Sequence, residues 1–341
     1  MAARNFAHNK TGDFMKILVI FTGGTIGSAV SDGWISPTED MKYLLISKYR
    51  EVTGDASEFE TVTPYTVLSE NLSALHLNSL ISSVISNISN YDGIIVTHGT
   101  DTIQYSAAAL SFALGSNSIP VVLVSSNYPL EDSRSNGLDN FIAAVEFIKS
   151  GIGRGVFVSY KNGMEATKIH IGTRLLSHNE NLDYLNSFDS EPYALYDGRI
   201  IKNENCICTS EAYNLADSSF SEHSGILVIQ SVPGDSFSYK LDGVKAIIFR
   251  PYHSGTLNTS SESLAAFCER AKALSIPVFV VNVHGNITYE TSKEFENLGV
   301  TVLPMCAFPS VFVKLWLISG SNDAIKELMQ QNIANEYHNN A

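Results

Sequence analysis

Residues 91–102, YDGIIVTHGTDT, contain an apolar run that is followed by a glycine, threonines and an aspartate. Residues 93–96 predict a buried parallel strand, because both faces of the run are apolar and β-branched residues dominate it. Apolar residues then recur at helical spacing on one face, and Gly115 is placed to end that helix. Thr100 and Asp101 therefore lie between the end of a strand and the first turn of a helix, where open α/β sheets bind ligands.

Asp101 also has a purely structural interpretation. Residues 101–104 match the capping-box pattern, in which the aspartate side chain binds free amides of the helix and Gln104 bonds back. From this stretch alone, Asp101 can be interpreted either as a helix cap or as a carboxylate that binds a ligand.

The composition of the chain limits the class of protein. The chain has 341 residues, of which 44% are hydrophobic and 17% charged, and its formal net charge is -13. This length predicts two domains rather than one. The negative charge argues against nucleic acid and against an anionic membrane surface as partners. No apolar run has the length of a membrane span and no signal segment is evident, so a cytoplasmic location is expected.

A glycine-rich turn follows another apolar run. Residues 17–21, ILVIF, predict a strand, and residues 22–27, TGGTIG, follow at once. The turn lacks both the dinucleotide-binding glycine pattern and a P-loop lysine, and the four cysteines lack zinc-site spacing. A nicotinamide cofactor, a P-loop nucleotide and a zinc site are therefore not expected. The turn either presents the hydroxyls of Thr22 and Thr25 to a ligand or is structural only.

Further polar residues follow other predicted strands. Ser69 and Glu70 come between a β-like run and a predicted helix, a position that also suits a helix cap. Ser126 follows an apolar strand, and Lys168 lies beyond a hairpin turn at residues 162–163. A solvated strand lysine is the default interpretation of Lys168.

The order of the predicted elements indicates an α/β fold. Strands alternate with helices, which predicts two parallel-sheet domains with right-handed crossovers. Residues 15–190 are predicted to form a larger, flavodoxin/Rossmann-like N-terminal domain that carries the candidate threonines, residues 191–222 a linker, and residues 223–341 a smaller C-terminal α/β domain. The apolar stretch 311–318 suits either the core or a subunit interface.

The chain contains TGGTIG at residues 22–27, HGTDT at residues 98–102 and a Thr-Lys pair at residues 167–168. Taken together, these motifs resemble the bacterial-type L-asparaginase family. Segments such as GVKAIIFRPYHSG at residues 243–255 look like its cytoplasmic, type I branch. The resemblance covers nearly the whole chain from Lys16. It implies an amidohydrolase without metal or cofactor that converts L-asparagine to L-aspartate and ammonia, in a homodimer or homotetramer.

The resemblance also implies roles for residues that match the family's motifs. The catalytic positions are Thr25, Thr100, Asp101 and Lys168. The substrate-binding positions are Ser69, Glu70, Asp101 and Ser126. A threonine hydroxyl is a weak nucleophile that needs a base or a hydrogen-bonded partner, and backbone amides at the Thr100 turn can stabilise an oxyanion. Which threonine, Thr25 or Thr100, forms the acyl intermediate is open.

Two positions depart from the family's pattern. Trp34, in the small and polar segment 28–37, aligns with a lid tyrosine, and an indole has no hydroxyl to relay a proton. That segment is either a lid or a surface loop. Glu70 stands where glutamine or serine is common, and a carboxylate there favours a substrate ammonium. The alternatives are therefore an amidase acting on glutamine, D-amino-acid or peptide amides, and a catalytically weakened amino-acid-binding protein.

Overall fold

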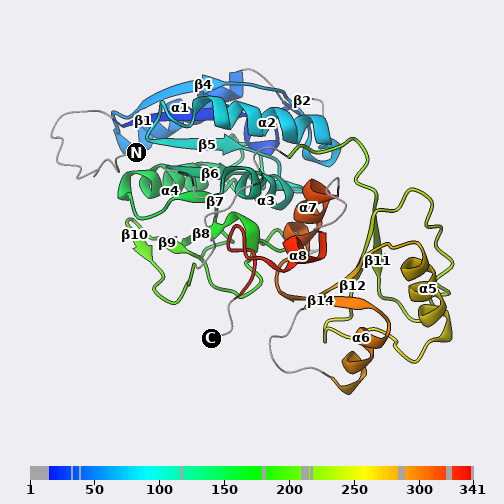
Figure 1. Ribbon diagram of the computed structural model, residues 1–341. Coiled ribbons are helices and arrows are strands. Elements are labelled where there is room, and N and C mark those ends of the chain that lie inside the picture. Colours follow the sequence, from blue (N-terminus) through cyan, green and yellow to red (C-terminus); the bar gives the residue numbers. More distant parts are fainter. Residues whose placement is uncertain are drawn as a thin grey trace, which may run out of the picture.

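The computed structural model contains two sheets and a separate two-stranded hairpin within the described residues. The described residues are 15–31, 34–37, 40–115, 117, 119–178, 182–208, 215, 218–282, 289–319 and 325–338. The larger sheet and its helices occupy the upper left of Figure 1, and the smaller sheet lies at the lower right. Among these residues, no helix is both long and apolar enough to cross a bilayer.

The larger sheet is mainly parallel. Its parallel strands are β1 (Lys16–Phe21), β4 (Glu58–Val62), β5 (Gly93–Thr97), β6 (Pro120–Val124) and β7 (Gly155–Tyr160). Their spatial order is β4-β1-β5-β6-β7, the flavodoxin-like order in which the winding reverses between β1 and β5. Strands β5 and β6 are buried along their whole length, as their continuous apolar sequences predict.

An antiparallel extension completes this sheet. It consists of β8 (Thr167–Ile171), β9 (Ala194–Tyr196) and β10 (Ile200–Lys202). Strands β9 and β10 lie within residues 191–222, which the sequence assigns to a linker. Each has three residues, too few to show alternation in the sequence, so pairing with β8 rather than local pattern defines them. The domain boundaries themselves stay a prediction.

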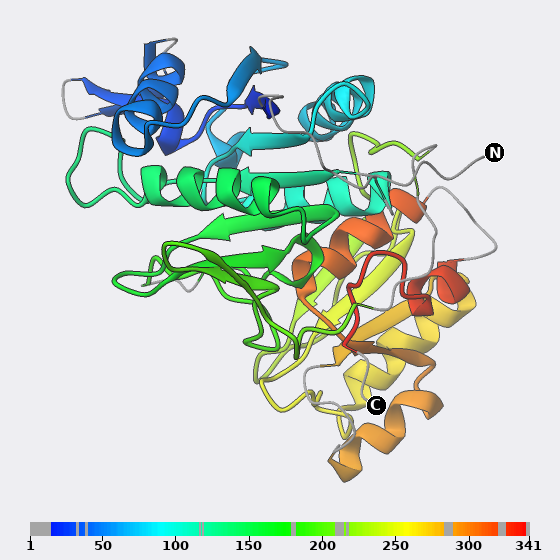
Figure 2. The same ribbon diagram turned by 90° about the vertical axis from the view of Figure 1, so that its left-hand side faces the viewer.

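Helices cover both faces of the larger sheet. Helices α1 (Asp40–Thr53) and α4 (Gly137–Ser150) pack on one face, and Figure 2 shows α4, in green, lying along it. Helices α2 (Ala74–Asn87) and α3 (Ile103–Leu114) pack on the other. Gly115 ends α3 with a φ of 54°, as the sequence predicts.

The smaller sheet is parallel throughout. It contains β11 (Ile226–Gln230), β12 (Ala246–Arg250), β13 (Val278–Asn282) and β14 (Val300–Met305), side by side in chain order. Helices α5 (Glu262–Ala273) and α6 (Glu294–Asn297) contribute to the core on one face. The predicted class, two α/β domains of unequal size, is confirmed.

Helix α7 (Phe308–Ile318) joins the two domains. It packs against α3 of the larger domain, and its apolar residues share one core with Ile248 and Phe279 of the smaller sheet. Figure 1 shows α7 and α8 (Ile325–Gln330) between the two sheets. Of the two interpretations of residues 311–318, core is therefore the one that the structure supports.

A buried ion pair fixes the chain after α7. Lys314 and Glu336 have fully buried side chains, with Nζ 2.6 Å from Oε1. Glu336 also accepts hydrogen bonds from the backbone amides of Ile333 and Ala334. Burial lowers the pKa of Lys314, while the Glu336 carboxylate opposes that shift. The C-terminal segment is thereby held against α7.

We predict that Lys314→Met lowers the free energy of unfolding by about 3–5 kcal/mol, because it leaves the Glu336 carboxylate buried without its cation. Urea unfolding followed by circular dichroism measures the loss. Lys326→Met, at an exposed position on α8, is the control and should change stability by less than about 0.5 kcal/mol. The double variant Lys314→Met/Glu336→Leu should regain most of the loss. Equal stability of Lys314→Met and Lys326→Met would contradict the argument.

Candidate active site

Two of the predicted motifs meet where the winding of the larger sheet reverses. Thr25 lies in a single turn of 3-10 helix, Thr25–Gly27, that follows β1. Thr100 and Asp101 lie between β5 and α3. Strands β1 and β5 are parallel neighbours, with Phe21 opposite Thr97. Residues about seventy-five positions apart in the sequence are therefore adjacent at one edge of the sheet.

The two turns touch through glycine backbone. Gly24 has a φ of +78°, and a Cβ atom there would lie 2.4 Å from the Gly99 nitrogen. A Cβ atom on Gly99 would lie 2.4 Å from the hydroxyl oxygen of Ser69. Such distances are sterically forbidden, so the approach depends on the absence of side chains at both positions. Three separate loops thus come together at two glycines.

Ser69 belongs to the third loop, in the 3-10 turn Ser69–Asn71. Its hydroxyl donates a hydrogen bond to Asp101 Oδ2 at 3.3 Å, and its carbonyl accepts one from Thr102 Oγ1 at 2.9 Å. Ser69 is buried, whereas Asp101 and Glu70 are exposed. The residue that begins helix α2 as its N-cap is Ser73, so the helix-cap interpretation of Ser69 is wrong.

Asp101 does not have the capping-box geometry. Helix α3 begins at Ile103 with Thr102 in the N-cap position, one residue later than the pattern requires. The side-chain nitrogen of Gln104 donates to the Asp101 carbonyl at 2.9 Å, whereas a capping box needs the glutamine oxygen to accept from the cap residue's amide. The structural interpretation of Asp101 is therefore wrong, and its exposed carboxylate is free to contact a ligand.

The two hydroxyls of the glycine turn have different surroundings. Thr22 is 2% exposed, and its Oγ1 donates to the Thr97 carbonyl at 2.6 Å, which links β1 to β5. Thr25 is half-buried. Of the two threonines, Thr25 is therefore the one whose position allows contact with a small molecule.

Ser126 and Lys168 lie further along the same edge of the sheet. Ser126 follows β6 and is fully buried; its hydroxyl lies 2.7 Å from Ser135 Oγ and donates to the Tyr128 carbonyl. Lys168 is on β8, separated from β5 by β7 and β6, and its Nζ forms an ion pair with Glu165 Oε2 at 2.7 Å. The structure brings the turns of Thr25, Ser69, Thr100 and Asp101 together and pairs Lys168 with Glu165 instead.

Trp34 is the first residue of a strand. Residues Ser28–Ser31 (β2) and Trp34–Pro37 (β3) form an antiparallel hairpin, where the sequence predicts an irregular loop or lid. The many small and polar residues of this segment do not give the apolar pattern by which a strand is recognised in a sequence. Strand β3 contacts the Thr25 turn. The side chain of Trp34 lies outside the described part of the structure, so its lid role stays a prediction.

His98 is a buried residue that links the turn before Thr100 to helix α3 by hydrogen bonds. Its Nδ1 lies 2.9 Å from the Gly99 carbonyl oxygen and its Nε2 lies 2.8 Å from Ser106 Oγ. Complete burial lowers the pKa of His98 to about 4, so the imidazole is neutral at pH 7. Ser106 and Thr102, which hold this turn, are not singled out by the sequence, because hydroxyl residues near a helix start are common.

Known proteins are similar to this chain in sequence and in fold. The family model for the N-terminal part of asparaginases matches residues 16–207. The chain is 29% identical over 359 residues to a subunit of the glutamyl-tRNA(Gln) amidotransferase of Methanobrevibacter smithii, covering 98% of this chain and 79% of that protein. It is 26% identical over 336 residues to an L-asparaginase of Thermococcus kodakarensis, covering 94% of this chain and 99% of the relative.

Two solved structures have the same fold. The thermostable L-asparaginase from Thermococcus kodakarensis superposes with a TM-score of 0.78 at 24% identity, over 95% of this chain and 100% of that one. L-asparaginase I from Vibrio cholerae gives a TM-score of 0.77 at 22% identity, over 96% of this chain and 100% of the other. The two-domain α/β architecture is therefore shared with both.

We predict that Gly24→Ala lowers the free energy of unfolding by at least about 2 kcal/mol, because the new Cβ atom meets backbone and the residue keeps a positive φ. The matched control is Gly27→Ala in the same turn, where a Cβ atom has no described neighbour within 4 Å. Urea unfolding of both variants tests the contact. Equal losses would contradict it.

The buried His98 should make stability depend on pH. Its pKa is about 4 in the folded protein and 6.5 ordinarily, so the unfolded chain takes up the proton first as the pH falls. The stabilisation is complete above pH 6.5 and declines towards pH 4, by at most about 3 kcal/mol. Urea unfolding across this interval should show a shallower decline for His98→Gln than for the wild type. Parallel curves would contradict the assignment.

Proposed function

This chain belongs to the asparaginase family, and on that premise we propose that it hydrolyses the side-chain amide of L-asparagine to L-aspartate and ammonia. One observation carries the proposal. The turn of Thr25 contacts the turn of Thr100 and Asp101 through Gly24 and Gly99, while Ser69 bonds Asp101. A candidate nucleophile and groups that can bind an amino acid therefore share one edge of the sheet.

The proposed reaction has two steps. The hydroxyl of Thr25 attacks the amide carbon and loses its proton to a neighbouring base. The base returns this proton to the amide nitrogen, and the tetrahedral intermediate releases ammonia to leave an acyl ester. Water then hydrolyses the ester, which frees aspartate and restores the threonine. Backbone amides at the Thr100 turn, next to the N-terminus of α3, are suited to stabilise the oxyanion of both intermediates. Thr100 is the second candidate for the nucleophile.

Lys168 has to break its ion pair with Glu165 before it can take part in the proposed reaction. Its side chain is 24% exposed and that of Glu165 is 52% exposed. An ion pair this accessible contributes about 0–1 kcal/mol, so breaking it costs little. We propose that bound substrate draws the ammonium towards Thr100 and Asp101, where it completes the triad-like group that the family resemblance implies.

Asp101, Ser69 and Glu70 are proposed to select the substrate. The exposed Asp101 carboxylate suits the α-ammonium group, and the Ser69 hydroxyl beside it suits the α-carboxylate. Glu70 adds a second negative charge that favours an ammonium and disfavours a further acidic group. Ser126 is proposed to act through its carbonyl or a bound water, because its hydroxyl is already engaged. A cytoplasmic location and a homo-oligomer stay predictions.

Glutamine is the second candidate substrate. The amidotransferase component of Methanobrevibacter smithii is similar over 98% of this chain, and the L-asparaginase of Thermococcus kodakarensis over 94%. Sequence similarity alone does not separate an enzyme that acts on free asparagine from one that serves an amide transfer. The net charge of -13 opposes direct contact with RNA, which favours a free amino acid as substrate.

We predict ammonia release from asparagine that depends on both threonines. Thr25→Ala and Thr100→Val should each lower kcat/KM by roughly a thousandfold, equivalent to about 4 kcal/mol of transition-state stabilisation. Thr61→Val, at an exposed position on β4, is the control and should keep wild-type activity. Circular dichroism establishes that each variant is folded.

The same assay separates the alternatives. A higher kcat/KM for glutamine than for asparagine would favour the second candidate. Tight binding of an amino acid in calorimetry without ammonia release would identify a binding protein and overturn the proposed hydrolysis. A folded wild-type protein that neither binds nor hydrolyses the amides would overturn both candidate substrates.

A further inference from the structure

Two free cysteines lie one residue apart at the end of the larger sheet. Cys206 and Cys208 follow β10 and flank Ile207, and their thiol groups are hydrogen-bonded to each other. Cys206 is 8% exposed, whereas Cys208 is exposed. The pair therefore combines a protected thiol with one that solutes can reach.

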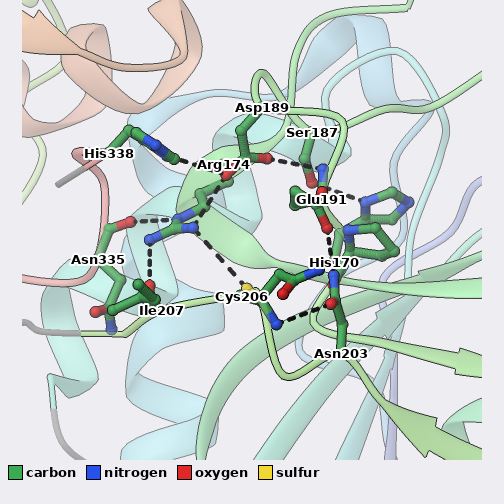
Figure 3. A network of polar contacts seen from close by, with 12 residues as sticks. His170, Arg174, Ser187, Asp189, Glu191, Asn203, Cys206, Ile207, Asn335 and His338 are labelled. Carbon is green, nitrogen blue, oxygen red and sulfur yellow. Dashed lines mark hydrogen bonds and ion pairs between the residues drawn. The ribbon is translucent and has the colours of Figure 1, made fainter. Parts of the chain in front are cut away.

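Arg174 holds this pair in place. Figure 3 shows its guanidinium between Cys206, Asp189, Ile207 and Asn335. Its Nη1 lies 3.9 Å from Cys206 Sγ, and its Nη2 donates to the Ile207 carbonyl at 2.8 Å. The ion pair with Asp189 at 3.0 Å and a hydrogen bond from Nε to the Asn335 carbonyl fix the guanidinium, which is buried. A permanent cation thus lies beside the sulfur atom of Cys206.

The two thiols differ in acidity. The hydrogen bond with Cys206, together with the charges of Arg174 and Lys202, lowers the pKa of Cys208, against burial and the Asp189 carboxylate. The same hydrogen bond and burial raise the pKa of Cys206. Of the two thiols, Cys208 is therefore the one that more readily forms the thiolate, which is the nucleophilic form.

Cys208 also lines a cavity of about 310 Å³. The cavity lies at the amino end of β7, whereas the candidate active site lies at the carboxyl ends of the strands. Arg154 lines it too, as does Asn117, whose side-chain amide is buried and has no hydrogen-bond partner among the described residues. This volume admits a small molecule, and a guanidinium and an amide suit a carboxylate.

We propose that Cys208 is a thiol-exchange site for small dicarboxylate disulfides that enter this cavity, and that Cys206 resolves the product into a Cys206–Cys208 disulfide. The Cys208 thiolate attacks one sulfur of the small disulfide, the S–S bond breaks, and a thiolate leaves with its electron pair. Cys206 gives its proton to that thiolate and attacks the Cys208 sulfur. The second thiolate leaves and takes a proton from water. The protein dithiol loses two electrons, and the small disulfide becomes two thiols.

The test uses dithiodiglycolate as the probe and intact-mass and peptide analysis of the folded, full-length protein. We expect the wild type to lose two hydrogens, carry no adduct and yield a peptide with Cys206 joined to Cys208. Cys206→Ser should stop at one adduct on Cys208, and Cys208→Ser should not react. Cys268 and Cys306, which are 2% and 4% exposed, are the internal controls and should stay unmodified.

Two further measurements need no cysteine variant. Alkylation of wild-type Cys208 should slow as the pH falls, since the thiolate is protonated at lower pH, and Cys208 should keep its reactivity to a lower pH than an ordinary cysteine. Dithiodiglycolate should react several-fold faster than cystamine, a disulfide of similar size with ammonium groups, and Arg154→Gln should reduce that preference. The net charge of -13 would produce the opposite preference, so faster reaction with cystamine would overturn the proposed ligand class. Reaction of Cys208 no faster than that of Cys268 would overturn the site itself.

Discussion

The backbone contact between Gly24 and Gly99 is the constraint on which the candidate site depends. It lets the turn after β1 and the turn after β5 approach more closely than any side chain permits, and Ser69 fills the remaining space beside Gly99. The hydrogen bond from Thr22 to the Thr97 carbonyl ties the same two strands together just below the turns. Steric exclusion at two glycines therefore sets where Thr25, Thr100 and Asp101 stand relative to one another.

The two proposed sites lie at opposite ends of the strands of the larger sheet. The winding reverses between β1 and β5, the point at which open α/β sheets bind ligands, and amide chemistry is proposed at the carboxyl ends of these strands. At the other end, the buried Arg174 connects the chain after β10 with the C-terminal segment, and its guanidinium lies 3.9 Å from the sulfur atom of Cys206. Helix α7 connects both regions to the smaller sheet through one shared core.

Much of the fold is visible in local sequence patterns. Continuous apolar runs predict β1, β5, β6 and the strands of the smaller sheet, and the spacing from Ile103 to Leu114 predicts α3, because burial imposes a period that the sequence must repeat. The strands that the sequence does not predict are short or consist mainly of small and polar residues. Strands β9 and β10 exist through pairing with β8, and the hairpin of β2 and β3 is composed largely of small residues.

The sequence by itself determined the α/β class, the two glycine-containing motifs and their placement at strand ends, because each depends on contacts between residues close in the chain. Only the tertiary structure decided that Thr22 is buried while Thr25 is accessible, that Asp101 bonds Ser69 instead of capping α3, and that Lys168 rests on Glu165. Those outcomes depend on which strands lie side by side and on how closely their turns approach. Local residue patterns do not encode such long-range distances.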